Sequence, residues 1–161
     1  MKTFLATLTT TLLLASPAFA DGKIYVQLPD LSSMTGAEAE AFLSEVVLAN
    51  VVSSNCAGYE ITDEEWSLLT DSADMLARGQ LGLSIDDYDS QYYGPAFAAL
   101  DKADACATHG PDVQPVIDRL IELGGSREAL PDQDAAYQAE QARQLGWDAM
   151  ALTPEKKTKT K

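Results

Sequence analysis

The sequence predicts an all-α protein, a single bundle-like domain of four to six helices cross-linked by one disulfide. Three observations predict it. Apolar residues recur at spacings of three and four along several segments between residues 35 and 152. Ser or Thr stands where three of these segments begin, and Gly or Pro follows most of them. About 140 residues remain after an N-terminal export signal, which is enough for one core and too few for two.

An extended leader over residues 21–34 is expected before the first helix. Its short alternating run, Ile24–Leu28, favours extended chain, but no other segment of the sequence offers this run a strand partner. Thr35 and Glu38 then fit a capping box, in which each side chain satisfies a free backbone N–H. The helix that follows, to about Ser54, is apolar around much of its circumference, which is typical of a buried central helix.

Two further starting signals predict the next two helices. Thr62 and Glu65 form a second capping box, and Gly79 is expected to end that helix as a left-handed C-cap. Ser84 is expected to cap the third helix, with aspartates in its first turn.

A proline interrupts the third helix. Because Pro cannot donate a helical hydrogen bond, the Gly94-Pro95 pair predicts a kink or a break near Tyr93. The remaining apolar pattern predicts three more helices, over residues 96–107, 111–124 and 132–150.

The first 20 residues predict a cleavable secretory signal peptide. A lysine at the second position is followed by the uncharged run Phe4–Ala15, which is shorter than the roughly 20 residues of a membrane span. Ala18 and Ala20 present the small residues that a signal peptidase requires, so the mature chain begins at Asp21. We therefore expect a periplasmic or secreted protein, exported by the general route and not inserted in the membrane after cleavage.

The mature chain is strongly acidic. All 25 Asp and Glu residues follow the cleavage site, with ten of the 11 Lys and Arg residues, which gives a net charge of −15. Four of those cations lie in a basic tail over residues 153–161 that is expected to be disordered, so residues 21–152 carry six cations, 24 carboxylates and a net charge of −18. Such a surface repels nucleic acid and anionic lipid. The expected partner is an unknown protein or a small-molecule ligand.

Cys56 and Cys106 are the two cysteines of the chain. In an oxidising compartment they predict one disulfide, whose loop of about 50 residues stabilises the fold by about 4 kcal/mol in the chain-entropy model. A zinc site would need more ligands than these two residues and His109 supply, and a redox site would favour a closer Cys-x-x-Cys spacing. The sequence therefore predicts a structural bridge, with no metal and no cofactor.

No catalytic residue is assigned from the sequence, and the protein is not expected to be an enzyme. The elbow Gly-x-Ser-x-Gly is absent, and the single histidine, His109, stands just after a predicted helix end, where surface exposure is usual. Asp86–Asp89 resemble the opening of a calcium loop, but, counted from Asp87, the sixth and twelfth positions hold Tyr92 and Ala98 where Gly and Glu are required.

Four aromatic residues of the third helix form the candidate binding surface. Tyrosine can bury its ring and keep its hydroxyl in water, which suits an interface. The alternative is that these side chains pack the helix onto the core. The candidates are Tyr88, Tyr92, Tyr93 and Phe97.

Three short segments carry a family resemblance: Ser54-Asn55-Cys56, Leu81-Gly82-Leu83-Ser84, and Cys106 with Gly110 after it. Through them the chain resembles a family of small exported two-cysteine helical bacterial proteins of unknown function. In that family an early Asn-Cys ends the first helix, and the second Cys follows a central helical stretch. The resemblance implies an all-α fold and implies no activity.

The layout of the two cysteines is also similar to that of periplasmic acid-stress chaperones, small helical proteins with a disulfide across a comparable loop. Those proteins become cationic in acid and expose apolar surface to unfolding clients. Protonation of the 25 carboxylates here would change the net charge from −15 to about +10. The first functional hypothesis is therefore a non-enzymatic exported binding module. An acid-activated chaperone and a hydrolase with an unrecognised site are the alternatives.

Overall fold

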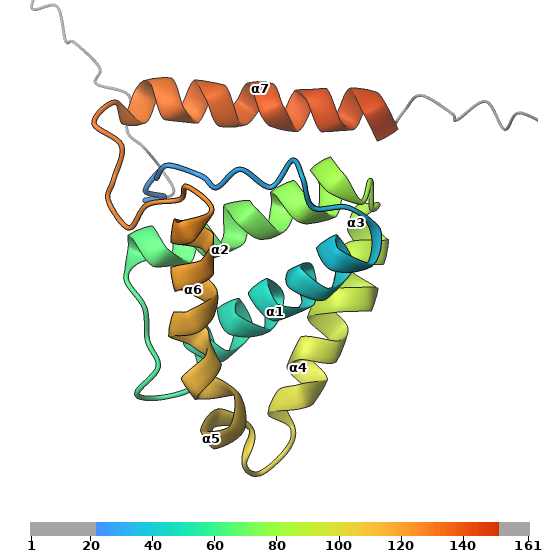
Figure 1. The fold of residues 1–161 in the computed structure, drawn as a ribbon, viewed down its shortest axis with the longest axis vertical. Helices are drawn as coiled ribbons and strands as arrows, with labels where there is room; N and C mark the ends of the chain where they lie inside the picture. Colours follow the sequence, from blue (N-terminus) through green and yellow to red (C-terminus); the bar gives the residue numbers. More distant parts are fainter. Residues whose placement is uncertain (1–21, 152–161) are drawn as a thin grey trace, which may run out of the picture.

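The computed structural model describes residues 22–151 and has an all-α fold (Figure 1). Five of its α-helices have seven or more residues, within the predicted range. The signal peptide, its cleavage at Ala18, Ala20 and Asp21, and the basic tail lie outside the described residues. The elements in chain order are α1 (Gly36–Asn55), α2 (Asp63–Asp74), the π-helix η1 (Met75–Gln80), α3 (Ile85–Tyr88), the π-helix η2 (Asp89–Tyr93), α4 (Gly94–Leu100), α5 (Ala105–His109), the 3-10 turn η3 (Gly110–Asp112), α6 (Val113–Glu122) and α7 (Gln133–Ala151).

Helix α1 forms the centre of the fold, as its apolar circumference predicts. It contacts α2, α4 and α6, which surround it in Figure 1. Phe42, Leu43, Val46 and Val47 are almost inaccessible to solvent. Because successive α1 residues point to different sides, this burial requires neighbours on several faces.

Of the three N-terminal caps that the sequence predicts, two are present and one is not. Thr62 and Glu65 form the capping box, with each side chain 3.2 Å from the other's backbone N–H. The Ser84 hydroxyl accepts from the Asp87 N–H at 3.1 Å. The capping box predicted at Thr35 is wrong, since its side chain makes no cap hydrogen bond. Gly36 turns the chain into α1 with a φ of 52°, a conformation that glycine adopts readily.

Gly79 does not form the predicted C-cap. Helix α2 continues as η1 to Gln80, and the left-handed turn follows at Gly82, whose φ is 61°. Gly79 is instead a packing position, because a Cβ there would lie 3.4 Å from Nε1 of Trp147.

The backbone does not break at Pro95. It stays helical from α3 through η2 into α4. The interruption is a π-helical turn, in which the N–H of Gly94 donates to the carbonyl of Asp89, five residues earlier. In a regular α-helix, the residue at this position would donate an N–H to the carbonyl four residues earlier, and the proline ring would clash with that carbonyl. The wider π-helical turn avoids both problems.

The leader does have a partner, which corrects the sequence prediction. Val26 forms an antiparallel bridge with Ala129, and the N–H of Leu130 donates to the carbonyl of Tyr25 at 2.8 Å. The partner segment after α6 has no strand-like alternation, so sequence patterning could not reveal it. Leu31 of the leader is fully buried, which makes the leader part of the core.

Helix α7 lies apart from this core. In Figure 1 it crosses one side of the molecule, and the leader runs between it and the other helices. The apolar core cluster includes residues from Val26 to Leu120, and no described side chain of α7 belongs to it. Trp147 is the one buried apolar residue among the described side chains of α7.

Candidate functional site

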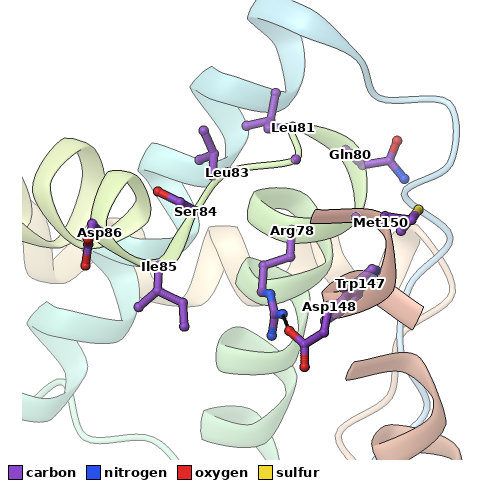
Figure 2. A pocket seen from close by; sticks show the side chains of 12 residues that line it. Arg78, Gln80, Leu81, Leu83, Ser84, Ile85, Asp86, Trp147, Asp148 and Met150 are labelled. Atoms are coloured by element: carbon purple, nitrogen blue, oxygen red, sulfur yellow. Dashed lines mark hydrogen bonds and ion pairs between the residues drawn. The ribbon is translucent and has the colours of Figure 1, made fainter. Parts of the chain in front are cut away.

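A pocket of about 650 Å³ lies between the loop after η1 and the last turns of α7 (Figure 2). Residues 78–86 line one side of it. Trp147, Asp148 and Met150 of α7 line the other. We call this site the loop–α7 pocket.

Local backbone bonds hold the loop side of the pocket in place. The N–H of Leu81 donates to the carbonyl of Leu76 at 2.9 Å, and the N–H of Leu83 donates to Ala77 at 2.8 Å. Gly82 makes the left-handed turn between them. The loop is therefore fastened to η1 before Ser84 starts the next helix.

Two π-helical segments flank the pocket loop. Six residues of η1 precede the loop, and five residues of η2 follow the single turn of α3. π-Helical residues are rare in proteins, well below about 1% of all residues, and frequently occur at functional sites. Their position on both sides of the pocket favours this pocket as the functional site.

Arg78 crosses the floor of the pocket. Its guanidinium donates to Oε1 of Gln144 and pairs with Oδ1 of Asp148 (Figure 2), and lies 5.4 Å from the ring centre of Trp147. These contacts to α7 compensate its charge. Asp86 is exposed at the loop edge, so the pocket has a net negative charge.

Apolar side chains of both walls face the pocket. Ile85 is 71% exposed and Met150 59% exposed, while Trp147 is only 9% exposed. Leu81 and Leu83 lie half-buried above them (Figure 2). Such a combination of apolar walls and few polar groups is typical of a ligand site.

The lining residues offer little for catalysis. Ser84 has the one hydroxyl among them, and that hydroxyl donates to Oδ2 of Asp87 at 2.7 Å. The lining includes no histidine, lysine or cysteine that could act with it as a base or nucleophile.

The four aromatic residues proposed from the sequence do not form one exposed surface. Tyr88 and Tyr92 are each 9% exposed and belong to the core cluster. Tyr93 is half-buried, and its hydroxyl accepts from Nδ2 of Asn50 at 3.3 Å. Phe97 is 52% exposed. Burial raises the pKa of Tyr88, so this phenol stays neutral. Tyr88 and Tyr92 pack into the core, where η2 contacts α1.

Sequence reasoning missed the pocket residues because each appeared unremarkable alone. Leu81 and Leu83 stand between the predicted helix end at Gly79 and the predicted cap at Ser84, and Trp147 and Met150 belong to a predicted helix with few large apolar residues. One signal was present. Leu81, Leu83 and Ile85 place three branched apolar side chains in a short connection, where polar residues are usual.

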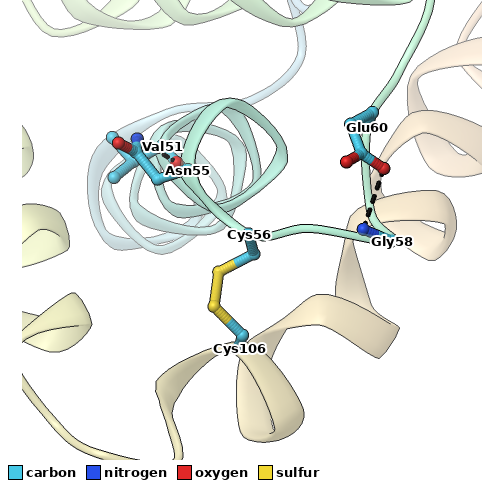
Figure 3. The surroundings of a disulfide bond; sticks show 6 residues. All are labelled: Val51, Asn55, Cys56, Gly58, Glu60 and Cys106. Atoms are coloured by element: carbon cyan, nitrogen blue, oxygen red, sulfur yellow. Dashed lines mark hydrogen bonds between the residues drawn. A yellow bond between two sulfur atoms is a disulfide. The ribbon is translucent and has the colours of Figure 1, made fainter.

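Cys56 and Cys106 form the predicted disulfide, with their Cα atoms 5.5 Å apart (Figure 3). It joins the end of α1 to α5. Gly110, four residues after Cys106, packs against the ring of Tyr59, where a Cβ would come within 2.2 Å of that ring. The bridge and this close contact hold the short α5 against the core.

His109 lines a second pocket, of about 380 Å³, between α1 and α6. It is the last residue of α5 and half-buried. Nη1 of Arg119 lies 3.2 Å from Oε2 of Glu45, and its guanidinium stacks 4.1 Å from the ring centre of Phe42. In the described part of the chain, no group of three or more His, Cys, Asp and Glu is arranged to hold a metal ion.

A cluster of carboxylates lies beneath α7. Nζ of Lys23 is 2.6 Å from Asp71 and 3.7 Å from Glu140, and Arg143 also pairs with Glu140. Burial raises the pKa of Asp71. Burial, with the charges of Asp71 and Glu140, raises the pKa of Asp74 to about 6.

Comparison with known protein families, curated proteins and solved structures found no match for this chain. Of the helices within residues 22–151, none is long and apolar enough to cross a membrane.

Proposed function

We propose that the protein is an exported, non-enzymatic binding module, and that the loop–α7 pocket binds an apolar group carried by a cationic partner. One observation carries the proposal: apolar side chains line both walls of the loop–α7 pocket, whose loop lies between two π-helical segments. The predicted signal peptide and the disulfide support export.

The negative charge at the pocket favours a cationic partner. Asp86 and Asp148 lie at the pocket edge, and Asp148 keeps 62% of its side chain exposed although it pairs with Arg78. With the charge of −18 on residues 21–152, this favours a segment with Lys or Arg beside an apolar residue.

Peptide selection tests the proposal. The mature chain, with its disulfide formed, is used to select binders from a displayed random-peptide library, and affinities are measured by calorimetry. We expect peptides that combine basic and apolar residues, and at least a tenfold loss of affinity for Ile85→Ser. The matched control is Leu145→Ser, since Leu145 is 69% exposed on α7 but does not line the pocket. Failure to select binders, or equal affinity of the Ile85 variant, would overturn the proposal.

The hydrolase alternative depends on the carboxylates beneath α7. Asp71 and Glu140 converge there, and a shifted pKa accompanies them, as acid–base catalysis requires. However, their side chains are only 4% and 9% exposed, and Lys23 and Arg143 bind them. The pocket beside them holds about 180 Å³, below the roughly 300 Å³ of small ligand sites. These features favour a structural ion-pair layer over a catalytic pair.

The acid-activated chaperone alternative predicts an opening of the fold in acid. The raised pKa of Asp74 argues for the opposite response between about pH 4 and pH 6, because protonation there favours the folded state. Light scattering of an aggregating client at about pH 2–3 separates the two functions. Suppression of aggregation by the mature chain would favour the chaperone.

A further inference from the structure

The loop–α7 pocket exists only while α7 is docked. Its loop wall is one continuous segment, residues 78–86, which runs from the end of η1 to the start of α3 and is fastened by backbone bonds to Leu76 and Ala77 of η1. Its opposite wall is the end of α7, with Trp147, Asp148 and Met150. Separation of α7 from the body would leave the loop wall facing water, without a cavity. The stability of α7 docking therefore sets the fraction of molecules able to bind.

Polar contacts attach α7 along its length. At its start, Gln133 accepts from the N–H of Tyr25 at 2.7 Å and donates to the carbonyl of Tyr25 at 2.9 Å. In the middle, Glu140 lies against Lys23, and near the end Asp148 pairs with Arg78. The main apolar contribution is Trp147, which packs on Gly79.

The other elements of the protein form the apolar core without α7. The disulfide joins α1 to α5, far from α7 in sequence. Elements with few buried apolar contacts open locally at lower free energy than the whole domain. Helix α7 can thus separate while the other helices stay folded.

Lys23 occupies the central position of the attachment. Its ammonium is shared between Asp71 of α2 and Glu140 of α7, and it is the one cation bound by both helices among the described ion pairs. Without it, Asp71, Asp74 and Glu140 would face one another with Arg143 and Arg78 as the nearby cations. Unpaired buried charge is strongly destabilising, and separation of α7 relieves it by letting water in.

We propose that α7 is a latch for the loop–α7 pocket, held by the ion pairs of Lys23, and that its release dismantles the binding site. The control of binding by α7 rests on the proposed function. The docking and release of α7 can be observed without a ligand. Affinity then follows docking: if only about one molecule in ten keeps α7 docked, the apparent affinity falls about tenfold.

Trp147 reports the latch directly. In a Trp66→Phe background it is the only tryptophan, and Trp66 is 42% exposed, so its replacement has little effect on the fold. At pH 8, we expect Lys23→Ala to shift Trp147 emission to the red and to make it more accessible to acrylamide, while the core still unfolds cooperatively. Lys23→Arg should keep the emission of the parent. The charge-matched control is Lys102→Ala, at an exposed loop position between α4 and α5.

Binding provides the second measurement. Lys23 does not line the loop–α7 pocket, so a tenfold or greater loss of peptide affinity in Lys23→Ala would act through α7. Unchanged Trp147 emission in Lys23→Ala would overturn the latch. If Lys23→Ala shifts Trp147 emission but leaves the peptide affinity unchanged, the control of the pocket by α7 would be overturned. If the parent binds no peptide at all, the proposed function fails, while the fluorescence still decides whether Lys23 holds α7.

Discussion

Helices α1 and α7 have similar lengths, 20 and 19 residues, but are held in the protein by different forces. Ten residues of α1 are buried, most of them apolar. Only Glu140 and Trp147 are buried among the described side chains of α7. Each large apolar side chain buried from water contributes roughly 1.5–3 kcal/mol. The ion pairs of α7 stabilise less, because an exposed pair contributes at most about 1 kcal/mol and desolvation offsets much of the attraction in a buried pair such as Lys23 with Glu140.

This difference separates stability from function. The fold around α1 depends on apolar burial and the disulfide, and the loop–α7 pocket depends in addition on a helix attached by ion pairs and amide bonds. Variants of the core should change the free energy of global unfolding. Variants of the attachment should change α7 docking first.

The largest expected effect comes from the disulfide. Replacing both cysteines, Cys56→Ser with Cys106→Ser, should lower the free energy of unfolding by about 4 kcal/mol, because the unfolded chain loses a closed loop of about 50 residues. Urea denaturation followed by circular dichroism measures this. Trp147 emission in native conditions should stay that of the parent. A loss below about 1 kcal/mol would show that the bridge adds little to the core.

A core truncation is expected to have the next largest effect. Leu43 of α1 is fully buried, so Leu43→Ala should cost about 3 kcal/mol of unfolding free energy. Leu145→Ala removes the same atoms from an exposed position of α7 and should change stability by no more than about 0.5 kcal/mol. Similar losses in the two variants would mean that α7 packs as part of the core.

The same division explains how far the sequence could predict this protein. The burial of α1, the capping at Thr62 and Ser84, and the disulfide follow from local pattern or from the number of cysteines, and the structure confirms them. Gly79 was wrongly predicted as a helix end because the indole that packs on it comes from Trp147, 68 residues later. Local signals cannot reveal such a contact.

The candidate site could not be predicted from the sequence for a similar reason. Tyr88 and Tyr92 are amphipathic, and sequence spacing does not distinguish an exposed face of a short helix from a face packed in the core. The pocket itself depends on how two segments meet, one at Leu83 and one at Trp147. Each segment alone lacks the pattern of a binding site.

A pH dependence tests the attachment of α7. Asp74 has a pKa of about 6 in the folded protein against 3.8 for the free side chain, so protonation favours the folded state. The stabilisation of the folded state by protonation of Asp74 is fully present below about pH 4 and is lost as the pH rises through about 6. Around Asp74 lie Asp71 of α2, Glu140 of α7, Lys23 of the leader, Arg78 of η1 and Tyr88 of α3.

Asp74→Asn should remove this dependence. At pH 7.5 the variant should be more stable than the parent by about 2 kcal/mol, allowing for partial exposure of the carboxyl, and the two should converge near pH 4. Urea titrations at a series of pH values measure the difference, and Trp147 emission shows whether it concerns α7 docking. A variant less stable than the parent at pH 7.5 would contradict the predicted sign.

The smallest expected effect concerns the cap at the start of α2. Thr62→Ala removes one hydrogen bond to the N–H of Glu65 and should lower the free energy of unfolding by about 1 kcal/mol. Thr35→Ala is its matched control, because Thr35 precedes α1 without making a cap bond, and should have an effect within about 0.5 kcal/mol. Neither variant should move Trp147 emission. If Thr62→Ala released α7 as well, the start of α2 would belong to the attachment, and the boundary between the two regions would have to be drawn through α2.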